Sequence, residues 1–211
     1  MQITSFYFPI FFLLLLITAC ETQKEAQNSI TVTSLPPKTI DLSSLDDFKT
    51  TDAENWKLAD NLYADRNTRH HLEAKEGSGI LVNLPDEDNR SDLYSSFEHA
   101  DIYLETDFMM PKGSNSGIYF QGRYEVQLLD SWGKENLNFS DCGAIYQRWD
   151  DDSKSGYEGN PPQINASRAP GLWQHLKVRF QAPRFDENGK KIANARFLSV
   201  YLNGSLVQEN V

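Results

Sequence analysis

The sequence predicts an all-β protein built as a sandwich of antiparallel strands, and three observations lead to this prediction. From residue 39 onward, apolar and polar side chains alternate in short runs, which is typical of strands with one buried face. Gly, Pro or Asn bounds these runs, and Asn203-Gly204 is a strong hairpin signal. Helical periodicity is weak, and residues 43–48 are compatible with at most one short turn. The clearest alternating runs are 102–108, 176–180 and 198–202.

The apolar residues of each run are expected to face the core, because successive side chains of a strand point to opposite faces. The residues expected inward are Ile102, Leu104, Phe108, Leu176, Val178, Phe180, Leu198, Val200 and Leu202. After the last hairpin, residues 206–211 are expected to form the returning strand. An unpaired edge at that strand would invite aggregation, so we expect the domain to need further strands beyond Val211.

Residues 1–19 are expected to form an export signal. They contain no Asp, Glu, Lys or Arg, and the apolar run 6–19 is shorter than the ~20 residues of a membrane span. The run ends in Ile17-Thr18-Ala19-Cys20, which resembles the lipobox of bacterial lipoproteins. We therefore expect cleavage before Cys20, lipidation of its thiol, and a protein anchored to the membrane of the bacterial cell envelope. The alternative is an ordinary cleaved signal followed by an incidental cysteine.

The rest of the chain is expected to contain a tether and one domain. Residues 20–38 have no aromatic residue and contain Pro36-Pro37, which is typical of a flexible linker. Residues 39–211 have enough apolar side chains for one hydrophobic core of ordinary size and too few for two.

Charge and cysteine content exclude several classes of protein. The chain has 30 acidic and 20 basic residues, a net charge of −10 and no basic block, so we expect no binding to nucleic acid. Two cysteines rule out a multi-disulfide scaffold and a cysteine-based zinc cluster. With Cys20 acylated, Cys142 has no intramolecular partner and is expected to be a small buried residue.

The most informative stretch is 115–147, where a polar face is expected on a strand. Gly122 marks a turn or a bulge. After it, Arg123, Glu125 and Gln127 alternate with apolar residues, so these three side chains share one face of the strand. That face combines a guanidinium, a carboxylate and an amide, which is too polar for a core.

Carboxylates and amides with aromatic residues at their margin are suited to binding a sugar. Hydroxyl groups need donors and acceptors together, and the apolar face of a sugar ring stacks on Trp or Tyr. Glu105 and Asp107 provide another acidic face on the run 102–108. The alternative is that these positions form only the solvated outside of a sheet. The candidate substrate-binding residues are Asn115, Tyr119, Gln121, Trp132, Gln147 and Asn165, with Trp149 and Tyr157 in loops nearby.

The sequence does not declare a metal or cofactor site. Asp150-Asp151-Asp152 lacks the spacing of an EF-hand loop, so a solvated acidic loop is the favoured interpretation. The four histidines, at 70, 71, 99 and 175, also lack metal-ligand spacing. We assign no cofactor. A divalent metal remains an alternative to the hydrogen-bond donors that would stabilise negative charge on a substrate.

Six blocks of the sequence carry a resemblance to a known family. They are residues 115–118 (NSGI), 122–131 (GRYEVQLLDS), 142–146 (CGAIY), 161–168 (PPQINASR), 171–174 (GLWQ) and 182–186 (APRFD). In this order they resemble the 3-keto-disaccharide hydrolase family, formerly a domain of unknown function. The resemblance is dense over residues 113–207 and looser over 39–112.

The resemblance implies a concanavalin A-like β-sandwich, also called a jelly roll, in an exported protein of glycan-using bacteria. It implies action on a glycoside already oxidised to a ketone at C3, so a sugar 3-dehydrogenase is an expected partner that supplies the substrate. The family pattern continues with a Gln-Asp-His-Gly-like stretch and a final strand, which would follow Val211.

The ketone of such a substrate suggests a mechanism. It acidifies the hydrogen on C2, so a general base can form an enolate that expels the group on C1, and water then adds to the enone. The base should be a carboxylate with a raised pKa, and donors should face the enolate oxygen. We assign Glu125 as base or acid and Arg123 and Gln127 as orienting donors. Glu105 and Asp107 are secondary candidates.

Two other functions are kept as alternatives. A direct glycoside hydrolase of glucanase type would carry Glu-x-Asp-x-x-Glu on one strand. Residues 125–130 read Glu-Val-Gln-Leu-Leu-Asp, so Glu125 and Asp130 face opposite sides unless a bulge intervenes. A non-catalytic carbohydrate-binding lipoprotein would need the aromatic and amide groups but no base.

Overall fold

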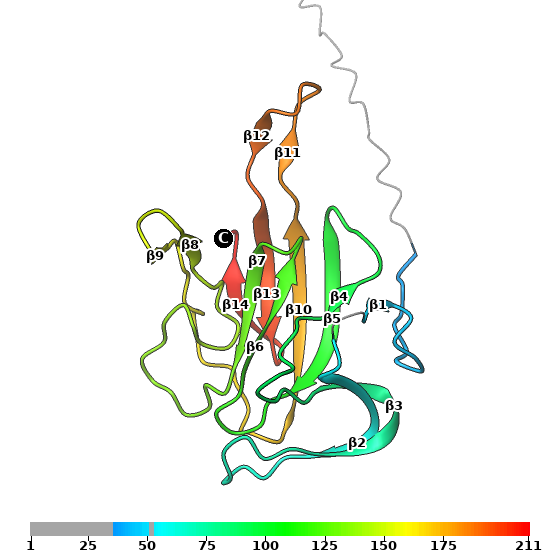
Figure 1. Ribbon diagram of the computed structural model, residues 1–211. Helices are drawn as coiled ribbons and strands as arrows, with labels where there is room; N and C mark the ends of the chain where they lie inside the picture. The colour runs from blue at the N-terminus through cyan, green and yellow to red at the C-terminus, as the bar shows by residue number, and fades with distance from the viewer. Residues whose placement is uncertain (1–35, 51–52) are drawn as a thin grey trace, which may run out of the picture. The chain divides into compact units, whose positions relative to one another are not determined.

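The computed structural model describes residues 36–50 and 53–211 and confirms the all-β prediction (Figure 1). None of the described residues forms a helix. Residues 43–48 make a turn, closed by a bond from Phe48 N to Leu45 O (2.9 Å), and not a helix. Ser43 donates its backbone N–H and its hydroxyl to the Asp41 carboxylate, and such local bonds compete with helix formation.

The expected signal peptide, Cys20 and residues 20–35 of the tether lie outside the described residues. Among the residues that are described, no helix is long and apolar enough to cross a membrane. Residues 39–211 form a compact unit, and everything below concerns this unit.

Fourteen strands make up the described fold, and their pairings are antiparallel. They are β1 (Phe48–Lys49), β2 (Trp56–Tyr63), β3 (Glu73–Asn83), β4 (Tyr94–Ser95), β5 (Ile102–Met109), β6 (Asn115–Phe120), β7 (Tyr124–Leu129), β8 (Arg148–Asp150), β9 (Ser155–Tyr157), β10 (Trp173–Gln181), β11 (Arg184–Phe185), β12 (Lys191–Ala193), β13 (Arg196–Leu202) and β14 (Ser205–Glu209).

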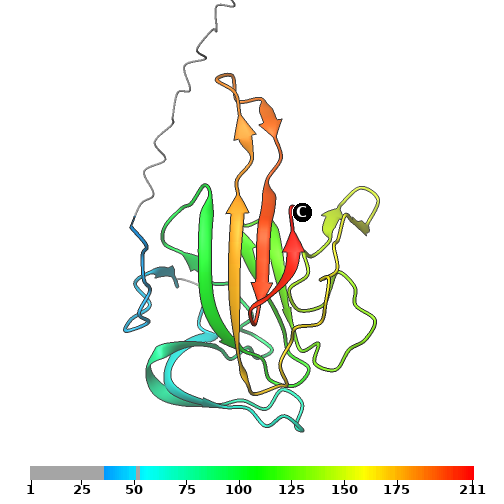
Figure 2. The ribbon, with the colours of Figure 1, turned by 180° about the vertical axis from the view of Figure 1, so that it is seen from behind.

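One layer of the sandwich is a four-stranded sheet in the order β14-β13-β10-β5. The pair β6–β7 lies against one face of this sheet. Figure 1 shows β6 and β7 in front of the sheet, and Figure 2 shows the sheet from behind. Residues 143–146 extend the second layer, because Gly143 N donates to Gln127 O (2.8 Å) and Tyr146 N to Glu125 O (3.0 Å). The second layer is therefore β6, β7 and this irregular third segment.

The core lies between the two layers. Val126 of β7 and Val178 and Val200 of the four-stranded sheet are fully buried. Phenylalanine rings fill the space near one end, where the ring centroids of Phe120 and Phe180 are 5.2 Å apart. Burial of each such side chain contributes about 1.5–3 kcal/mol relative to exposure. The alternation that predicted strands at 102–108, 176–180 and 198–202 is therefore the alternation that builds the core.

One inward-facing prediction, that for Leu198, is wrong. In the pairing of β10 with β13, Arg179 faces Ser199 and Phe180 faces Phe197, so Leu198 is skipped by a bulge. A bulge places two residues of one strand opposite one of its partner and reverses the alternation. As a result Phe197 is buried and Leu198 is only half-buried.

Both predicted hairpin turns are present. Asn203 and Gly204 have positive φ of 51° and 85°, the conformation of a type I′ turn, and they join β13 to β14. Gln121 and Gly122 also have positive φ, 54° and 63°, and Arg123 N closes this turn on the preceding strand.

One backbone hydrogen bond reaches β14 from outside its sheet, since Gln163 N donates to Val207 O (2.9 Å). The buried Gln208 side chain of the same strand donates to Gly143 O and Pro161 O, each at 3.1 Å. The first bond satisfies a carbonyl of β14, and the other two tie the strand to the loops beside it.

Cys142 is buried as predicted, at 2% exposed. Burial raises the pKa of its thiol, which agrees with a packing role for this residue.

Phe180 provides a test of the core. Phe180→Ala is expected to lower the free energy of unfolding by about 3–5 kcal/mol, because it removes a buried ring and leaves a cavity. Phe185→Ala is the matched control, since this ring is exposed on β11, and it should change stability by less than ~0.5 kcal/mol. Urea unfolding followed by tryptophan fluorescence measures both, and equal losses would contradict this account of the core.

Candidate functional site

The predicted polar face is present on the outside of the β6–β7 pair. Asn115, Gly117 and Tyr119 of β6 share this face with Glu125 and Gln127 of β7, because Tyr119 pairs with Glu125 and Gly117 with Gln127 in the strand register. The residues between them point into the core. The fold therefore holds these five residues on one pleated surface.

The Glu125 side chain lies directly over Gly117. A Cβ atom at position 117 would overlap Oε1, Cδ and Cγ of Glu125. A residue without a side chain is needed wherever another group approaches the backbone this closely. Gly117 thus makes the room in which the carboxylate is held.

A hydrogen bond fixes one oxygen of the Glu125 carboxylate. Tyr119 Oη donates to Glu125 Oε2 at 2.6 Å. Oε1 has no hydrogen-bond or ion-pair partner among the described residues. The carboxylate is therefore oriented at Oε2, while Oε1 lies against Gly117 with no hydrogen-bond partner in the described part of the chain.

Burial raises the pKa of Glu125 above its ordinary value. The nearby charge of Asp92 also raises this pKa, whereas the hydrogen bond from Tyr119 lowers it. Burial, followed by the bond to Glu125, raises the pKa of the Tyr119 phenol. The site therefore favours the protonated, neutral forms of both the Glu125 carboxyl and the Tyr119 phenol more than water does.

Asp92 is a part of the site that the sequence did not indicate. It lies in the segment before β4, outside the polar stretch 115–147, and it faces solvent. No local pattern links it to Glu125, because only the folded chain brings the two together. The structure thus adds a second carboxylate close to the first.

A cleft of about 180 Å³ opens beside Glu125, between the two layers of the sandwich. Arg123 lines it from the turn before β7, Tyr146 from the third segment of the second layer, Arg148 from β8, and Arg196 from β13. The remaining lining residues are Tyr124, Glu125, Ile145, Glu158, Phe180, Ala195, Phe197 and Val211. This cleft is the concave feature next to the polar face.

Arg123 and Gln127, predicted as donors, have different surroundings. Arg123 is exposed at the end of the hairpin turn and lines the cleft. Gln127 is only 2% exposed, and its Nε2 donates to Asn115 Oδ1 (2.8 Å). The buried Gln127 therefore binds the exposed Asn115, and a substrate on this face would meet Asn115 and not Gln127.

Glu105 and Asp107 lie on the outer face of the four-stranded sheet, so the hydrophobic core separates them from Glu125. His175 contacts both carboxylates, at 3.2 Å and 2.6 Å. A hydrogen bond from Lys177 (3.1 Å) is the main reason that the pKa of Glu105 is lowered. The structure does not bring these two residues into the site, and they form an exposed charged network instead.

Two of the predicted substrate-binding residues stabilise loops. Asn165 Nδ2 donates to Ser131 O (2.7 Å) and Lys134 O (2.9 Å). Gln121 Nε2 donates to His99 O (3.2 Å) across the hairpin turn. Their side-chain donors are therefore used within the protein.

The other predicted binding residues are divided between the site and its margin. Tyr119 is 54% exposed within the polar face. The Gln147 amide lies over Gly156, beside the short β8–β9 hairpin that presents the exposed rings of Trp149 and Tyr157. Trp132 is exposed in the loop after the opposite end of β7. The exposed rings of Trp149 and Tyr157 are thus on the side of the site near Glu125, whereas Trp132 is at the far end of β7.

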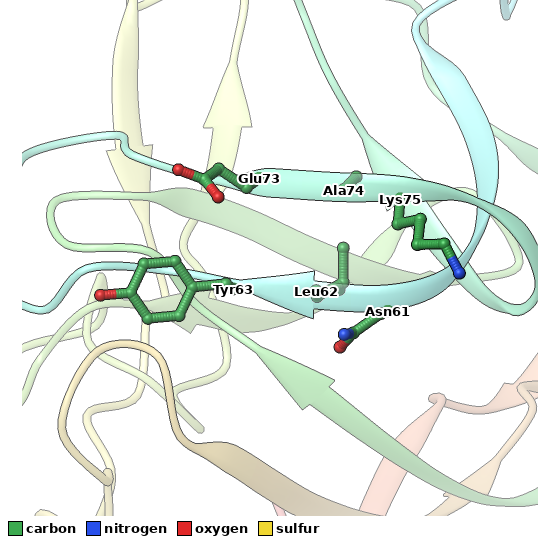
Figure 3. Close-up of a pocket in the computed structure, with 6 residues that line it drawn as sticks. All are labelled: Asn61, Leu62, Tyr63, Glu73, Ala74 and Lys75. Carbon is green, nitrogen blue, oxygen red and sulfur yellow. The ribbon is translucent and has the colours of Figure 1, made fainter.

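A second hollow, of about 210 Å³, lies on the β2–β3 hairpin (Figure 3). Figure 3 shows Tyr63 and Glu73 near one end of this hairpin segment and Asn61 and Lys75 farther along it. Lys75 pairs with Asp60 (2.9 Å), and its ammonium is well exposed. The Glu73 carboxylate of this hollow contacts His71 (3.2 Å) but is well exposed, unlike that of Glu125. The lining residues of the hollow are Asn61, Leu62, Tyr63, Glu73, Ala74 and Lys75.

Asp130 does not complete a carboxylate pair of glucanase type. Its Oδ2 accepts a hydrogen bond from Gly113 N (2.9 Å), so it closes the loop between β5 and β6. Within residues 36–50 and 53–211 there is also no group of three or more His, Cys, Asp or Glu arranged to hold a metal ion.

Fold and site together define a β-sandwich protein with a half-buried carboxylate beside a cleft. The chain belongs to the family of the 3-keto-alpha-glucoside-1,2-lyase-like domain, whose family model matches residues 43–211. This confirms the family resemblance and the concanavalin A-like fold class.

Two solved structures resemble the chain, and both are candidate glycosyl hydrolases from Parabacteroides distasonis ATCC 8503. The first has 22% identity and a TM-score of 0.55, with 81% of this chain and 63% of that chain covered. The second has 21% identity and a TM-score of 0.44, with 76% and 68% covered. This chain thus matches less than two thirds of the first structure. A comparison with curated proteins found no match.

Tyr119→Phe tests the assigned hydrogen bond. Because the bond from Tyr119 lowers the pKa of Glu125, its removal should raise that pKa further. Carbon-detected NMR titration of the glutamate carboxyls measures the change. Tyr103→Phe is the matched control, since Tyr103 donates to Glu105 on the other face (2.9 Å) and should leave the pKa of Glu125 unaltered. An unchanged or lower Glu125 pKa in Tyr119→Phe would refute the assignment.

Proposed function

We propose that this protein cleaves the glycosidic bond of 3-keto-glycosides, including 3-keto-disaccharides, by elimination followed by hydration. Family membership supports glycoside chemistry, and the family is described as that of a 3-keto-alpha-glucoside-1,2-lyase-like domain. The observation that carries the proposal is the Glu125 carboxylate, held over Gly117 with one free oxygen and a raised pKa.

The proposed reaction begins with removal of the hydrogen on C2. Glu125 Oε1 takes this proton, and the electron pair of the C–H bond forms an enolate with the C3 ketone. The enolate then collapses and expels the oxygen on C1, which takes the proton from Glu125 and leaves as an alcohol, so that an enone remains and the carboxylate is restored. Water adds across the enone, with its hydroxyl at C1 and a proton at C2, so the net result is hydrolysis of the glycosidic bond with no external oxidant or reductant.

Glu125 has the properties that this base needs. A base whose pKa lies closer to the working pH binds the transferred proton more strongly than an ordinary glutamate. Tyr119 holds Oε2, so the rotation of the carboxylate is restricted, and Oε1, which has no hydrogen-bond partner among the described residues, is the oxygen left to accept the proton. Tyr119 therefore acts as a positioning residue for Glu125.

Arg123 is the proposed donor that orients the sugar. It lies in the turn before β7, at the same end of that strand as Glu125, and it has no acidic partner among the described residues. Its several N–H donors suit the oxygens of a substrate bound in the cleft. Gln127 is assigned a supporting role through Asn115 in place of direct contact with the substrate.

A binding function without catalysis is the second candidate. Tyr119, Trp149 and Tyr157 present exposed rings around the polar face, and such rings stack on sugars whether or not a bond is cleaved. The two candidates differ in their need for Glu125, because stacking needs no base.

We also propose a setting for this reaction. Lipidation of Cys20 would hold the domain at the membrane of the bacterial cell envelope, and residues 20–38 would serve as its tether. The substrate must come from an enzyme that oxidises C3 of a glycoside, so a sugar 3-dehydrogenase is the proposed partner.

Glu125→Gln tests the catalytic assignment. It should lower the rate of sugar release from 3-keto-trehalose or 3-keto-lactose by about 10²–10⁴-fold, because the amide cannot accept the C2 proton. Binding of the keto sugar should persist, and the unoxidised sugars should not be cleaved. Glu105→Gln is the matched control on the opposite face and should retain full activity. Binding of sugar without any release by the unaltered protein would favour the second candidate.

The pH dependence of the reaction follows from the raised pKa of Glu125. The carboxylate is the active form, so kcat/KM should fall as pH falls through that pKa, at a higher pH than an ordinary glutamate would give. Tyr119→Phe should move this acid limb to still higher pH. A profile with its acid limb at the ordinary glutamate pKa, unmoved by Tyr119→Phe, would show that another group supplies the base.

A further inference from the structure

We infer that the cleft beside Glu125 binds an oxyanion, a carboxylate or sulfate group carried by the sugar, so that the substrate class is an acidic glycoside. The inference rests on the proposed function for the view that the ligand is a glycoside. It goes beyond that function by naming the chemical group that enters the cleft.

Three arginines from separate parts of the chain meet at this cleft. Arg123 comes from the turn before β7, Arg148 begins β8, and Arg196 begins β13. Guanidinium groups offer planar forks of donors that match the oxygens of carboxylate, sulfate or phosphate. The fold therefore gathers the side chain best suited to an oxyanion in a protein whose net charge is −10.

The acidic side chains that line the cleft form an ion pair with one of these arginines among the described residues. Glu158 Oε2 lies 3.1 Å from Arg148 Nη1, so this pair is satisfied. Glu125 accepts its hydrogen bond from Tyr119. Arg123 and Arg196 then have no acidic partner within the described part of the chain.

An arginine of the same protein outside the cleft shows the contrast. Arg184 binds both oxygens of Asp101 through two nitrogens, at 2.8 Å and 2.6 Å. This is the two-point contact that a guanidinium makes with a carboxylate. Arg123 and Arg196 have the same donors available and face a hollow, so a ligand oxyanion can supply the missing acceptor.

The floor of the cleft is apolar. Phe180 and Phe197 are nearly fully buried and line it from below, together with Ile145 and Tyr124. An apolar floor keeps water away on one side, which strengthens a charge-assisted hydrogen bond at the rim. A ring with one apolar face and an oxyanion at its edge fits this combination.

The size of the cleft limits what enters it. Pockets for whole drug-sized ligands measure ~300–1,000 Å³, whereas this cleft measures about 180 Å³. It therefore accommodates one ring or one substituent, and the rest of the glycoside would lie outside over Tyr119. A long polyanion such as nucleic acid is disfavoured by the negative charge of the remaining surface.

The test is an NMR-monitored titration of the full chain with three sugars at millimolar concentration. Methyl β-D-glucuronide carries a carboxylate, glucose 6-sulfate carries a sulfate, and methyl β-D-glucoside carries no charge. At least one acidic sugar should bind about tenfold or more tightly than the neutral one and shift the amide signals of Ile145 and Phe197. Added NaCl should weaken this binding. The stronger of the two acidic ligands identifies the oxyanion.

Arg123→Gln and Arg196→Gln should each weaken binding of the acidic sugar about tenfold and leave the neutral sugar unaffected. Arg179→Gln is the matched control. It removes the same charge from an exposed arginine, but Arg179 lies on the outer face of β10, away from the cleft. Thermal unfolding of each variant excludes loss of folding. Equal binding of charged and neutral sugars, no binding of either acidic sugar, or equal effects of all three substitutions would overturn the inference.

The titration is independent of turnover. If acidic sugars bind at the arginines but no 3-keto sugar is cleaved, the proposed function fails and the anion site remains. If 3-keto sugars are cleaved but the acidic sugars do not bind preferentially, this inference alone fails. Glu125→Gln should retain binding of the acidic sugar in either case.

Discussion

The packing of β7 against the four-stranded sheet determines the direction of every side chain in the candidate site. Val126 is fully buried and Leu128 nearly so, and a slip of one residue would bring Glu125 and Gln127 into the core. Burying an unpaired carboxylate among apolar side chains costs several kcal/mol, so the sequence strongly disfavours that register. Backbone bonds from residues 143–146 to the free edge of β7 hold the same arrangement from the other side. The position of the carboxylate is therefore a consequence of the core.

The environment of Glu125 is a balance between two opposing effects. Contact with Gly117 and Tyr119 removes water from the carboxylate and raises its pKa, while the hydrogen bond from Tyr119 stabilises the charged form. Without the hydrogen bond the carboxyl would be neutral over a wider range of pH, and without the burial it would be an ordinary surface glutamate. A side chain at position 117 would push the carboxylate toward solvent. The acidity of the group thus depends on a glycine and a tyrosine that lie on one neighbouring strand.

Sequence periodicity predicted the strands and the polar face because both are local properties of the chain. The side chains of Glu125 and Val126 point to opposite faces because successive residues of any strand do so. The residues Asn203 and Gly204 are sufficient by themselves to specify a tight turn. Long-range contacts could not be predicted in this way. The bulge that turns Leu198 away depends on pairing with β10, and the burial of Gln127 depends on Asn115. Glu105 and Asp107 looked equivalent to Glu125 in the sequence, but the sheet that carries them lies across the core. The charge of Asp92 acts on Glu125 only because the folded chain brings two distant parts of the sequence together.

The arginines of the cleft and Glu125 line the same hollow. The charge that acts on Glu125 is that of Asp92, which raises its pKa in the same direction as burial does. An oxyanion bound by Arg123 and Arg196, as inferred above, would place a further negative charge beside the carboxylate and raise its proton affinity again. Binding of an acidic sugar would therefore make Glu125 a stronger base when a C2 proton is within reach. On the proposed function, recognition of the substrate in the cleft would also prepare the group that removes this proton.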